Sequence, residues 1–375
     1  MTKAAELAKM GEVLTNSQIG GRRNIIINGA MQVAQRATSA TSVLASTAVI
    51  PACDRWMFEV SGSNTSGRLT VSQSTDTPNG FGNSLKLDVT TADTSIAADE
   101  FVSLVQRIEG QNLQQLKKGT SDAERVTLSF FAKGTAKKYA CGFYDVDNSR
   151  NVHAHFDVTT SWQRFIINFP ADTTGVFDND NAQSAFILFN LHAGTNFSSG
   201  TLNTTWQAND NTDRAAGIDS LLSSTDNELY ITGVQLEVGS QATPFEHRSF
   251  AEEQRLCQRY AIVYSKNGQP NMGQKAIGTG ASTNNSGAYQ AFIFPQVTMR
   301  AVPTLTVGGS VSDYEILKYE TGFVDLNSSI SLYSASGRSL FVLTFSSATA
   351  EAERGRDVIM RLEGDNSSLL FDSEL

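Results

Sequence analysis

Apolar and polar residues alternate along much of this 375-residue chain, and the pattern is clearest just after Leu229. One face of this segment holds Tyr230, Thr232, Val234, Leu236 and Val238, and the other holds Ile231, Gly233, Gln235 and Glu237. A period of two predicts a half-buried β-strand. Gly239 ends the strand, and Pro244 fixes an extended turn after it.

A short helix is predicted after this turn. Ser249 stands three residues before Glu252, which is the spacing of a capping box at a helix N-terminus. The helix is expected over residues 249–260. A strand that closes a sheet and leads into a bridging helix is typical of a domain boundary. We therefore expect one domain over residues 22–248 and another over 261–375.

The first of these domains contains a series of short strand patterns separated by turn residues. The patterns cover Asn24–Ile27, Trp56–Val60, Arg68–Gln73, Ser84–Thr90, Phe101–Ile108, Val126–Phe131, Tyr139–Tyr144, Val152–Val158, Phe165–Phe169 and Phe186–Leu191. Many short strands at fairly regular spacing predict an all-β fold, namely a jelly-roll β-sandwich. Gly194–Thr225 interrupts the series as a long polar excursion, which is either a loop or a small subdomain.

The second domain is predicted to be a smaller β unit. Its strand patterns cover Tyr289–Phe294, Pro303–Val307, Glu315–Tyr319, Ser329–Tyr333, Ser339–Phe345 and Asp357–Leu362. Gly268–Ser286 is polar and is predicted to be nearly structureless. We find no internal repeat of fixed period, which argues against a solenoid or a β-helix.

Residues 1–21 are predicted to form an N-terminal helix for attachment or oligomerisation. Leu7, Met10 and Leu14 follow the spacing of one helix face, and Gly20-Gly21 ends the pattern. So short a seam cannot form an independent coiled coil. Three such helices can pack about the axis of a homotrimer, or each can lie on its own domain.

Composition excludes several classes of protein. Charged residues make up 18% of the chain and the net charge is −9, so the overall field does not favour nucleic acid. The longest apolar runs are far shorter than the roughly 20 residues of a membrane span, and we expect no membrane insertion. The N-terminus lacks the apolar core of a signal peptide. Cys53, Cys141 and Cys257 are odd in number and widely spaced, which predicts free thiols.

Three separated parts of the chain resemble those of one protein class. GVQLEVGSQATPFEHRSFAEEQRLCQRY at Gly233–Tyr260 resembles a signature of bacteriophage tail-fibre and related virion appendage proteins. GGRRNIIINGAMQV at Gly20–Val33, followed by Asp54-Arg55-Trp56, is similar to the opening of the same family, and FDSEL at Phe371–Leu375 to its ending. The resemblance implies a jelly roll similar to carbohydrate-binding modules, followed by a C-terminal tip domain. It implies a virion protein and no particular reaction.

Candidate metal ligands are few. His153, His155 and Asp157 share one face of a strand, either as transition-metal ligands or as a solvated outer face. Oxygen-rich clusters at Asp178–Asp180 and Asp210–Asp213 suit calcium, and the resemblance makes a structural calcium plausible, although neither matches an EF-hand. We expect no cofactor otherwise.

The chain shows no catalytic signature. A Gly-x-Ser-x-Gly elbow, a His-Glu-x-x-His helix, a Walker loop and a paired-carboxylate spacing are all absent from the sequence. His192 is interpreted as a strand-end residue in preference to a general base. We therefore expect that the protein is not an enzyme.

The tryptophans differ in their surroundings. Trp56 is predicted in the core, and in the related sandwiches a tryptophan at the place of Trp162 packs inside. Trp206 lies among Asn, Thr and Asp residues, a composition that suits sugar binding, because rings stack on sugars while amides bind hydroxyls. Anchoring of the excursion is the alternative. The candidate ligand-binding residues are Trp206, Asn209, Asp210, Asn271, Asn284 and Asn285.

Three functional hypotheses follow. The first is a structural virion protein, a tail fibre or capsid-attached fibre, that acts as a homotrimer, contacts other virion proteins and binds host-surface glycan for receptor binding without cleaving it. The second is a tailspike that depolymerises polysaccharide. The third is a free carbohydrate-binding protein. The first hypothesis places the chain in the virion.

Overall fold

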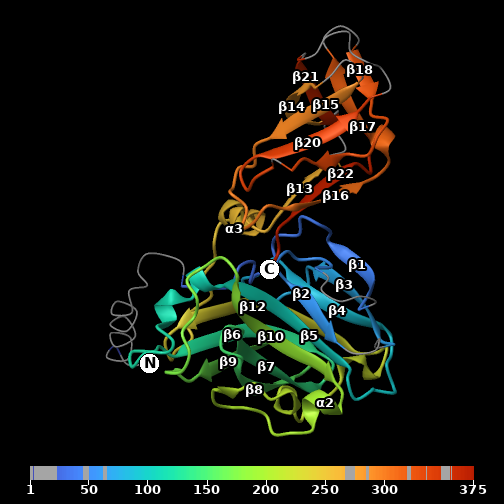
Figure 1. Cartoon of the computed structure of the whole chain (residues 1–375). Helices are drawn as coiled ribbons and strands as arrows, with labels where there is room; N and C mark the ends of the chain where they lie inside the picture. Colours follow the sequence, from blue (N-terminus) through green and yellow to red (C-terminus); the bar gives the residue numbers. More distant parts are fainter. Residues whose placement is uncertain are drawn as a thin grey trace. The chain divides into compact units, whose positions relative to one another are not determined.

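The chain forms two compact units, Met1–Glu253 with Leu375 and Gln254–Glu374 (Figure 1). The computed structural model describes residues 3, 23–44, 50–61, 66–266, 275–283, 287–318, 322–334, 336–347, 355 and 357–375. Each unit has a hydrophobic core of its own.

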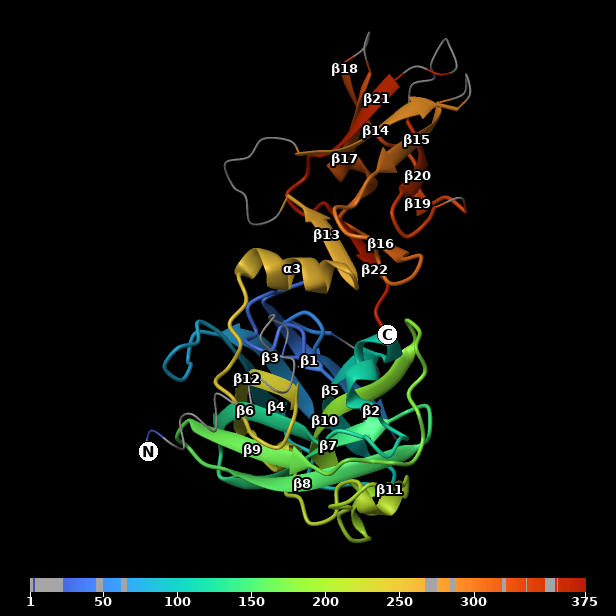
Figure 2. The same cartoon turned by 90° about the vertical axis from the view of Figure 1, so that its left-hand side faces the viewer.

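The first unit is a sandwich of two six-stranded antiparallel sheets. Sheet A holds, in spatial order, β1 (Ser39–Val43), β3 (Arg68–Ser74), β4 (Ser84–Thr91), β12 (Glu228–Val238), β6 (Val126–Gly134) and β9 (Gln163–Phe169). Sheet B holds β11 (Gln207–Ala208), β8 (Arg150–Val158), β7 (Lys137–Asp145), β10 (Gln183–Ala193), β5 (Phe101–Glu109) and β2 (Met57–Ser61). Short helical turns lie in the connections: η1 (Gly110–Asn112), η2 (Gln114–Leu116), α2 (Thr195–Ser198), η3 (Asn211–Asp213) and η4 (Leu221–Ser223). The predicted all-β jelly-roll sandwich is confirmed (Figure 2).

Aromatic side chains from both sheets meet in the core of this sandwich. Phe130 of sheet A meets Phe156 and Phe189 of sheet B edge-on, with ring centroids 5.1 and 5.0 Å apart. Such contacts contribute about 1 kcal/mol each beyond the area they bury. Trp56 is 1% exposed and belongs to the same core, as predicted.

Cys53 and Cys141 are free and buried, as the sequence predicted, and Cys257 is buried as well. Burial raises the pKa of the Cys53 and Cys141 thiols well above their ordinary value. Because the thiolate is the reactive form, these two side chains act as small apolar core residues.

A β-bulge in β12 reverses the alternation of its side chains. The core receives residues from both sides of the bulge, Leu229, Ile231, Val234 and Leu236. The register against β6 shifts between Thr232 and Gln235, and Gly233 adopts φ +62°. The prediction that Tyr230 and Thr232 share the face of Val234 is wrong, because the extra residue of a bulge changes which side chains point inward.

A buried polar network joins the turn after β12 to the chain before β1. The Glu246 carboxylate accepts hydrogen bonds from the backbone N–H groups of Arg23 (3.1 Å) and Asn24 (2.8 Å) and from the Arg248 guanidinium (3.2 Å). That guanidinium also donates to the backbone carbonyls of Asn24 and Ile26. Charge-assisted hydrogen bonds of this kind are among the strongest in proteins. They tie the two ends of the sandwich together.

The same network continues at Asn28. Its backbone N–H donates to the Glu253 carboxylate (2.5 Å), and its amide donates to the carbonyls of Val33 (2.8 Å) and Asp54 (2.9 Å). Asn28 has φ +58°, a left-handed conformation that asparagine tolerates. The Trp56 indole donates to the Asn28 carbonyl (3.1 Å). The motifs at Gly20–Val33 and Gly233–Tyr260 therefore contact each other, and their polar residues stabilise the closure of the sandwich.

Helix α3 (Phe250–Gln258) begins at the predicted cap. The Ser249 hydroxyl accepts a hydrogen bond from the backbone N–H of Glu252 (3.3 Å). Cys257 and Tyr260 are each 1% exposed. Among the described residues, no helix is both long and apolar enough to span a bilayer.

The second unit also contains two antiparallel sheets. Sheet C holds β13 (Ala261–Ser265), β22 (Ser368–Asp372) and β16 (Thr304–Gly308). Sheet D holds β18 (Gly322–Asp325), β17 (Tyr314–Lys318), β21 (Asp357–Leu362), β14 (Lys275–Ser282), β15 (Ala288–Ile293), β20 (Phe341–Ser346) and β19 (Ser331–Leu332), and η5 (Val311–Asp313) precedes β17. Phe371 of sheet C stacks on Phe341 of sheet D, with ring centroids 4.2 Å apart. This core is separate from that of the first unit.

Strand β14 corrects a prediction. Gly268–Ser286 was expected to be nearly structureless, but Lys275–Ser282 pairs with β21 on one side and β15 on the other. Its residues are small because the neighbouring backbone is close. A Cβ on Gly280 would lie 1.8 Å from the Gln290 carbonyl oxygen. Pairing on both sides therefore overrides a low strand propensity.

Candidate functional site

The outer face of sheet B is largely covered by the chain itself. Leu202 and Ala216 of the polar excursion pack on Ala140 of β7. The Arg214 guanidinium of the same excursion lies 4.6 Å from the ring centre of Phe101. Sheet B therefore leaves little of its outer face for a ligand in the described part of the chain, and the outer face of sheet A is the better candidate.

A row of alternating cations and rings crosses the outer face of sheet A. Lys86, Tyr230 and Lys133 are direct cross-strand partners on β4, β12 and β6, and Trp162 directly precedes β9. The Lys133 ammonium lies 4.9 Å from the ring centre of Tyr230 and 5.7 Å from that of Trp162. The Lys86 ammonium lies 5.5 Å from the ring centre of Tyr230. We call Lys86, Tyr230, Lys133 and Trp162 the cation–aromatic row.

Exposed carboxylates border this row. Asp76 forms an ion pair with Lys133 and accepts a hydrogen bond from the Trp162 indole (3.0 Å). Glu228 lies 3.2 Å from the Lys86 ammonium and accepts from the Tyr230 hydroxyl (3.1 Å). The Asp76 and Glu228 side chains remain 45% and 39% exposed. Hydrogen bonds from Lys133 and Trp162 hold the pKa of Asp76 below its ordinary value, so it is an anion at neutral pH.

The row combines the two kinds of group that sugars need. The half-buried Trp162 ring can stack on the apolar face of a pyranose, whereas Tyr230 is 7% exposed and lies close to two ammonium groups. Carboxylates and ammonium groups bind hydroxyls. Three inter-strand spacings separate Lys86 from Trp162, so the row is roughly 14 Å long. The expectation that Trp162 packs inside the sandwich is wrong. It is half-buried on the outer face, 6.2 Å from the ring of Tyr230.

A group of aromatic side chains supports the same face. Phe81 lies 5.3 Å from Phe131 and 5.0 Å from Phe245, between ring centroids, and His247 packs on the same ring at 5.3 Å. Gly233 lies under this group, since a Cβ there would approach Phe81 to 2.7 Å. The bulge of β12 therefore gives the aromatic group room to pack.

The predicted ligand residue Trp206 anchors the excursion to the sandwich. Its indole donates to the Pro170 carbonyl (2.8 Å), and its ring meets Phe143 edge-on with centroids 5.4 Å apart. The Lys118 ammonium lies 5.2 Å from its ring centre. These contacts agree with the anchoring alternative, and a ligand-binding role of Trp206 stays a prediction.

Asn209 and Asp210, predicted beside Trp206, hold the backbone of the excursion. The Asn209 side-chain oxygen accepts from the Asn151 amide (2.7 Å). The Asp210 carboxylate accepts from the backbone N–H (2.9 Å) and the hydroxyl (2.8 Å) of Thr212. One of the oxygens expected for calcium, Oδ1 of Asp210, is thus used in a local turn. A calcium site at Asp210–Asp213 stays a prediction.

The remaining predicted site residues lie outside the residues that the structure describes. They are Leu7, Met10, Leu14, Asn271, Asn284 and Asn285. Their expected roles in oligomerisation and ligand binding stay predictions.

In the described part of the sandwich, the ammonium group of Lys118 occupies a site that resembles a cation-binding site. The Lys118 Nζ lies 2.5 Å from Asp145, 3.0 Å from Asp172, and 2.7 and 3.1 Å from the carbonyl oxygens of Thr174 and Gly175. Two carboxylates and two carbonyls are a ligand set that calcium prefers. Here a lysine supplies the positive charge. Sequence reasoning missed this site, because its oxygens come from two separate segments, the end of β7 and the connection after β9, and the lysine comes from a third.

A cavity of about 340 Å³ lies beside Lys118 and is lined in part by Leu113, Val176 and Phe177. Its volume is near the lower end of small-molecule sites. The Gln114 amide at its wall donates to the carbonyls of Gly110 and Phe177, so the local polar groups mainly serve the fold.

His153 and His155 of β8 do not form a group of metal ligands with Asp157. His153 is 1% exposed, and no hydrogen-bond partner of either ring nitrogen is found. His155 and Asp157 are exposed, so a solvated face is correct for them and wrong for His153. The excursion covers His153, because the Asn203 carbonyl accepts its backbone N–H (2.6 Å). Burial and the charge of Arg214 lower the pKa of His153 to about 3.

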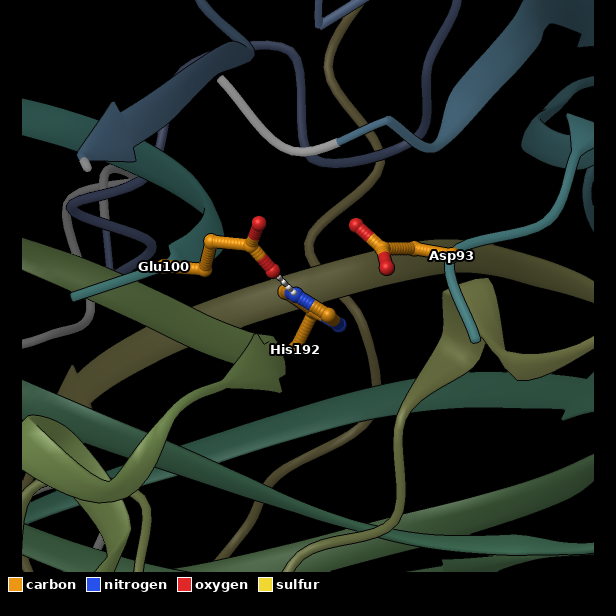
Figure 3. A group of neighbouring side chains, drawn as sticks. All are labelled: Asp93, Glu100 and His192. Atoms are coloured by element: carbon orange, nitrogen blue, oxygen red, sulfur yellow. Dashed lines mark hydrogen bonds and ion pairs between the residues drawn. The ribbon is translucent and has the colours of Figure 1, made fainter. Parts of the chain in front are cut away.

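Asp93, Glu100 and His192 form a buried polar group (Figure 3). The His192 Nε2 lies 3.1 Å from Glu100, and its Nδ1 lies 2.7 Å from the Ser220 hydroxyl. The Asp93 oxygens accept backbone N–H groups at residues 66 and 95. Carboxylates with an imidazole suit a metal, but the ring and the Asp93 oxygens already hold protein groups. The group fastens two connections to the end of β10.

Comparisons with known proteins give distant structural matches only. No family model matches the chain, and no curated protein matches it. The enzymatically active domain of tailspike protein 4 from bacteriophage CBA120 is 14% identical, with a TM-score of 0.31 over 58% of this chain. The match spans only 21% of that tailspike chain.

Carbohydrate-binding modules are also similar. The family 11 module of Clostridium thermocellum is 13% identical over 55% of this chain and 99% of its own, with a TM-score of 0.27. The module TmCBM61, solved with β-1,4-galactotriose, is 8% identical over 58% of this chain and 99% of its own, with a TM-score of 0.29. Because these TM-scores are below 0.5, the function proposed below rests on the geometry and the sequence motifs.

Proposed function

We propose that this protein is a structural component of a bacteriophage particle, a tail fibre or capsid-attached fibre, and that it binds host-surface glycan without cleaving it. The observation that supports binding is the cation–aromatic row with its exposed carboxylates. The role in the particle is supported by the motifs at Gly20–Val33 and Gly233–Tyr260. The homotrimer expected from the N-terminal segment belongs to the same proposal.

Binding is favoured over cleavage by the state of the carboxylates. A glycosidase needs one carboxylic acid that keeps its proton near neutral pH, and burial usually raises its pKa. At the row, Lys133 and Trp162 lower the pKa of Asp76. Glu228 is held by Lys86 and the Tyr230 hydroxyl. Asp76 is therefore suited to accept hydrogen bonds from hydroxyls and poorly suited to donate a proton.

The test is binding of the purified full chain to a panel of bacterial capsule and O-antigen polysaccharides. Trp162→Ala is expected to weaken binding about fivefold, since an aromatic contact contributes about 1 kcal/mol. Trp162→Phe keeps a ring and is expected to lose less. Ile166→Ala is the matched control, because Ile166 is 49% exposed on the adjoining strand β9 and is not part of the row.

Three results separate the hypotheses. Undiminished binding by Trp162→Ala contradicts the proposed site, and a loss in Trp206→Ala alone moves it to the excursion. New reducing ends released from a bound polysaccharide favour the depolymerase. Mass spectrometry of purified particles tests the virion role, and absence of the chain from particles favours a free carbohydrate-binding protein.

A further inference from the structure

The loop between β3 and β4 carries an asparagine followed by a glycine at its tip. The tip is a tight turn from Pro78 to Phe81, and the Phe81 backbone N–H donates to the Pro78 carbonyl (3.2 Å). Gly80 has φ +94°, the conformation that the third residue of a type II turn requires. Asn79 therefore stands at the second position of this turn. Both residues are exposed to solvent.

The peptide that joins Asn79 to Gly80 has room to move. In the described part of the chain, no hydrogen bond of the Asn79 amide or of the Gly80 N–H is found. Nothing lies within 4 Å of the position that a Cβ on Gly80 would take. The peptide can therefore rotate without displacing a neighbour, which is typical of exposed loop tips.

This arrangement favours one intramolecular reaction, in which the backbone nitrogen of Gly80 attacks the side-chain carbonyl carbon (Cγ) of Asn79. The N–Cγ bond forms, the Cγ–Nδ2 bond breaks, and the amide group leaves as ammonia with the proton of the attacking nitrogen. The product is a cyclic succinimide, and glycine allows it because no Cβ hinders the approach. Water then opens the ring. Cleavage of the N–Cγ bond gives aspartate, and cleavage of the bond to the main-chain carbonyl carbon gives isoaspartate.

The same dipeptide occurs elsewhere in a protected form. The chain contains three Asn-Gly pairs, which are Asn28-Gly29, Asn79-Gly80 and Asn267-Gly268. Asn28 is 0% exposed, and its amide donates to the carbonyls of Val33 (2.8 Å) and Asp54 (2.9 Å) while its side-chain oxygen accepts the Val33 N–H (2.9 Å). A side chain held in this way cannot turn toward the next backbone nitrogen. The third pair begins outside the described residues.

We propose that Asn79 is a site of spontaneous deamidation, through attack by the backbone nitrogen of Gly80, and that its isoaspartate product opens the turn. Isoaspartate places one additional methylene in the main chain, so the hydrogen bond from Phe81 to Pro78 no longer fits. The modified residue also gains a negative charge. Neither step needs an enzyme, an oxidant or a reductant.

The turn belongs to the loop that borders the candidate glycan surface. Asp76, three residues before Asn79, accepts the hydrogen bond from the Trp162 indole (3.0 Å). Phe81, two residues after Asn79, packs on Phe131 and Phe245. An opened turn loosens both attachments. Weaker glycan binding by the modified protein follows from this, and that consequence alone rests on the proposed function.

The test incubates the folded full chain in neutral buffer made with heavy-oxygen water, followed by tryptic digestion in ordinary water and mass spectrometry. Trypsin separates the three pairs into peptides 24–36, 69–86 and 267–275, and fragment spectra distinguish Asn79 from Asn83 in the second. We expect Asn79 to take up heavy oxygen roughly 100-fold faster than Asn28, because Asn28 reacts only in molecules that have opened locally. In urea the two rates should become similar.

The matched variant is Asn79→Gln, whose longer side chain has to close a larger and much slower ring. In the wild type, hydrogen exchange of the Phe81 amide is expected to become faster as isoaspartate accumulates, because this amide loses the Pro78 carbonyl. In Asn79→Gln the exchange should keep its initial rate throughout the incubation. Residue 79 is exposed, so folding does not depend on the substitution.

Each part of the proposal has its own contrary result. An unlabelled Asn79 in the folded protein, under conditions in which the urea-unfolded chain labels Asn28, overturns the modification site. A labelled Asn79 with unchanged exchange of the Phe81 amide overturns the opening of the turn. Polysaccharide binding is compared between incubated wild type and incubated Asn79→Gln. Unchanged binding despite an opened turn counts against the glycan surface beside Asp76 and leaves the deamidation standing.

Discussion

Lys118 shows how one residue replaces a bound ion. Its ammonium is 3% exposed and neutralises Asp145 and Asp172, which are as deeply buried. Lys118→Met leaves Asp145 without its ammonium partner, while Asp172 keeps its ion pair with Arg150. Removing one side of a buried ion pair costs about 3–5 kcal/mol, and we expect that loss in urea unfolding. Lys117→Met is the control. Its ammonium is 53% exposed in a surface pair with Glu124, and less than about 1 kcal/mol should be lost.

The oxygens around Lys118 allow a second test, which measures calcium binding. Lys118→Ala vacates a space lined by Asp145, Asp172 and two backbone carbonyls, ligands that calcium prefers. We expect millimolar calcium to restore part of the lost stability in this variant and to leave the wild type unchanged. Equal stabilisation of both proteins would contradict this assignment and would indicate a calcium site elsewhere in the chain.

His153 predicts how stability depends on pH. Its pKa is near 3 in the folded chain, because burial and Arg214 disfavour the charged ring, and the unfolded value is about 6.5. The unfolded chain therefore binds the extra proton between these values, and stability falls as the pH drops through 6.5 toward 3. From pH 7 to pH 5 the loss attributable to His153 is about 2 kcal/mol. Chemical unfolding across that range measures it.

Two variants isolate this effect. His153→Gln cannot titrate, and we expect a slope of stability with pH reduced by about 2 kcal/mol over the same range. His155→Gln, at the exposed histidine of the same strand, should keep the wild-type slope. An unchanged slope in His153→Gln would show that other groups cause the acid sensitivity.

At the scale of elements, Gly233 sets which residues of β12 face the core. Its φ of +62° disfavours a side chain, and a Cβ would lie 2.7 Å from Phe81 and 2.9 Å from Phe131. We expect Gly233→Ala to lower the free energy of unfolding by roughly 2 kcal/mol, from the left-handed conformation and the displaced rings. Gly82→Ala is the control, since nothing lies within 4 Å of its Cβ. Equal effects of the two would refute this role.

Most of the strand series was readable from the sequence because alternation records which side chains are buried, but the strand predicted at Asn24–Ile27 is irregular chain in the structure. The same rule failed at β12, where a bulge inserts one residue, and local sequence does not distinguish Gly233 in a bulge from Gly233 in a regular strand. It failed again at β14, whose small residues carry no apolar pattern and which is held by pairing on both sides. Both failures arise from contacts between segments distant in the chain.

The candidate site was harder to predict than the fold. Composition directed attention to Trp206, whose polar neighbours hold the excursion together. Trp162 was assigned to the interior. Its place on the outer face follows from Lys133 and Tyr230, and the latter is 68 residues away in the sequence. A site built by cross-strand neighbours leaves no local motif.

At the scale of the whole molecule, the two units present faces of different chemistry. Sheet A carries a row of cationic and aromatic groups, and sheet D exposes the apolar side chains of Phe323 and Ile359 beside the ion pair of Arg361 and Glu315. Deleting Gly268–Ser286 to seek a receptor site would remove β14 and would test folding instead. Substitutions on the outer faces can test function while both cores stay intact.

Two separate cores also predict separate unfolding. Leu128 and Met360 are each fully buried, the first in the core of the first unit and the second in that of Gln254–Glu374. Truncation of such residues costs about 2–5 kcal/mol. In calorimetry we expect two transitions, with Leu128→Ala lowering the midpoint of one and Met360→Ala that of the other. A unit of 100–250 residues shifts by about 2–8 °C per kcal/mol, so each displacement should be well resolved. If either substitution moves both transitions by the same amount, the chain unfolds as one cooperative body and the separation of the cores has no thermodynamic consequence.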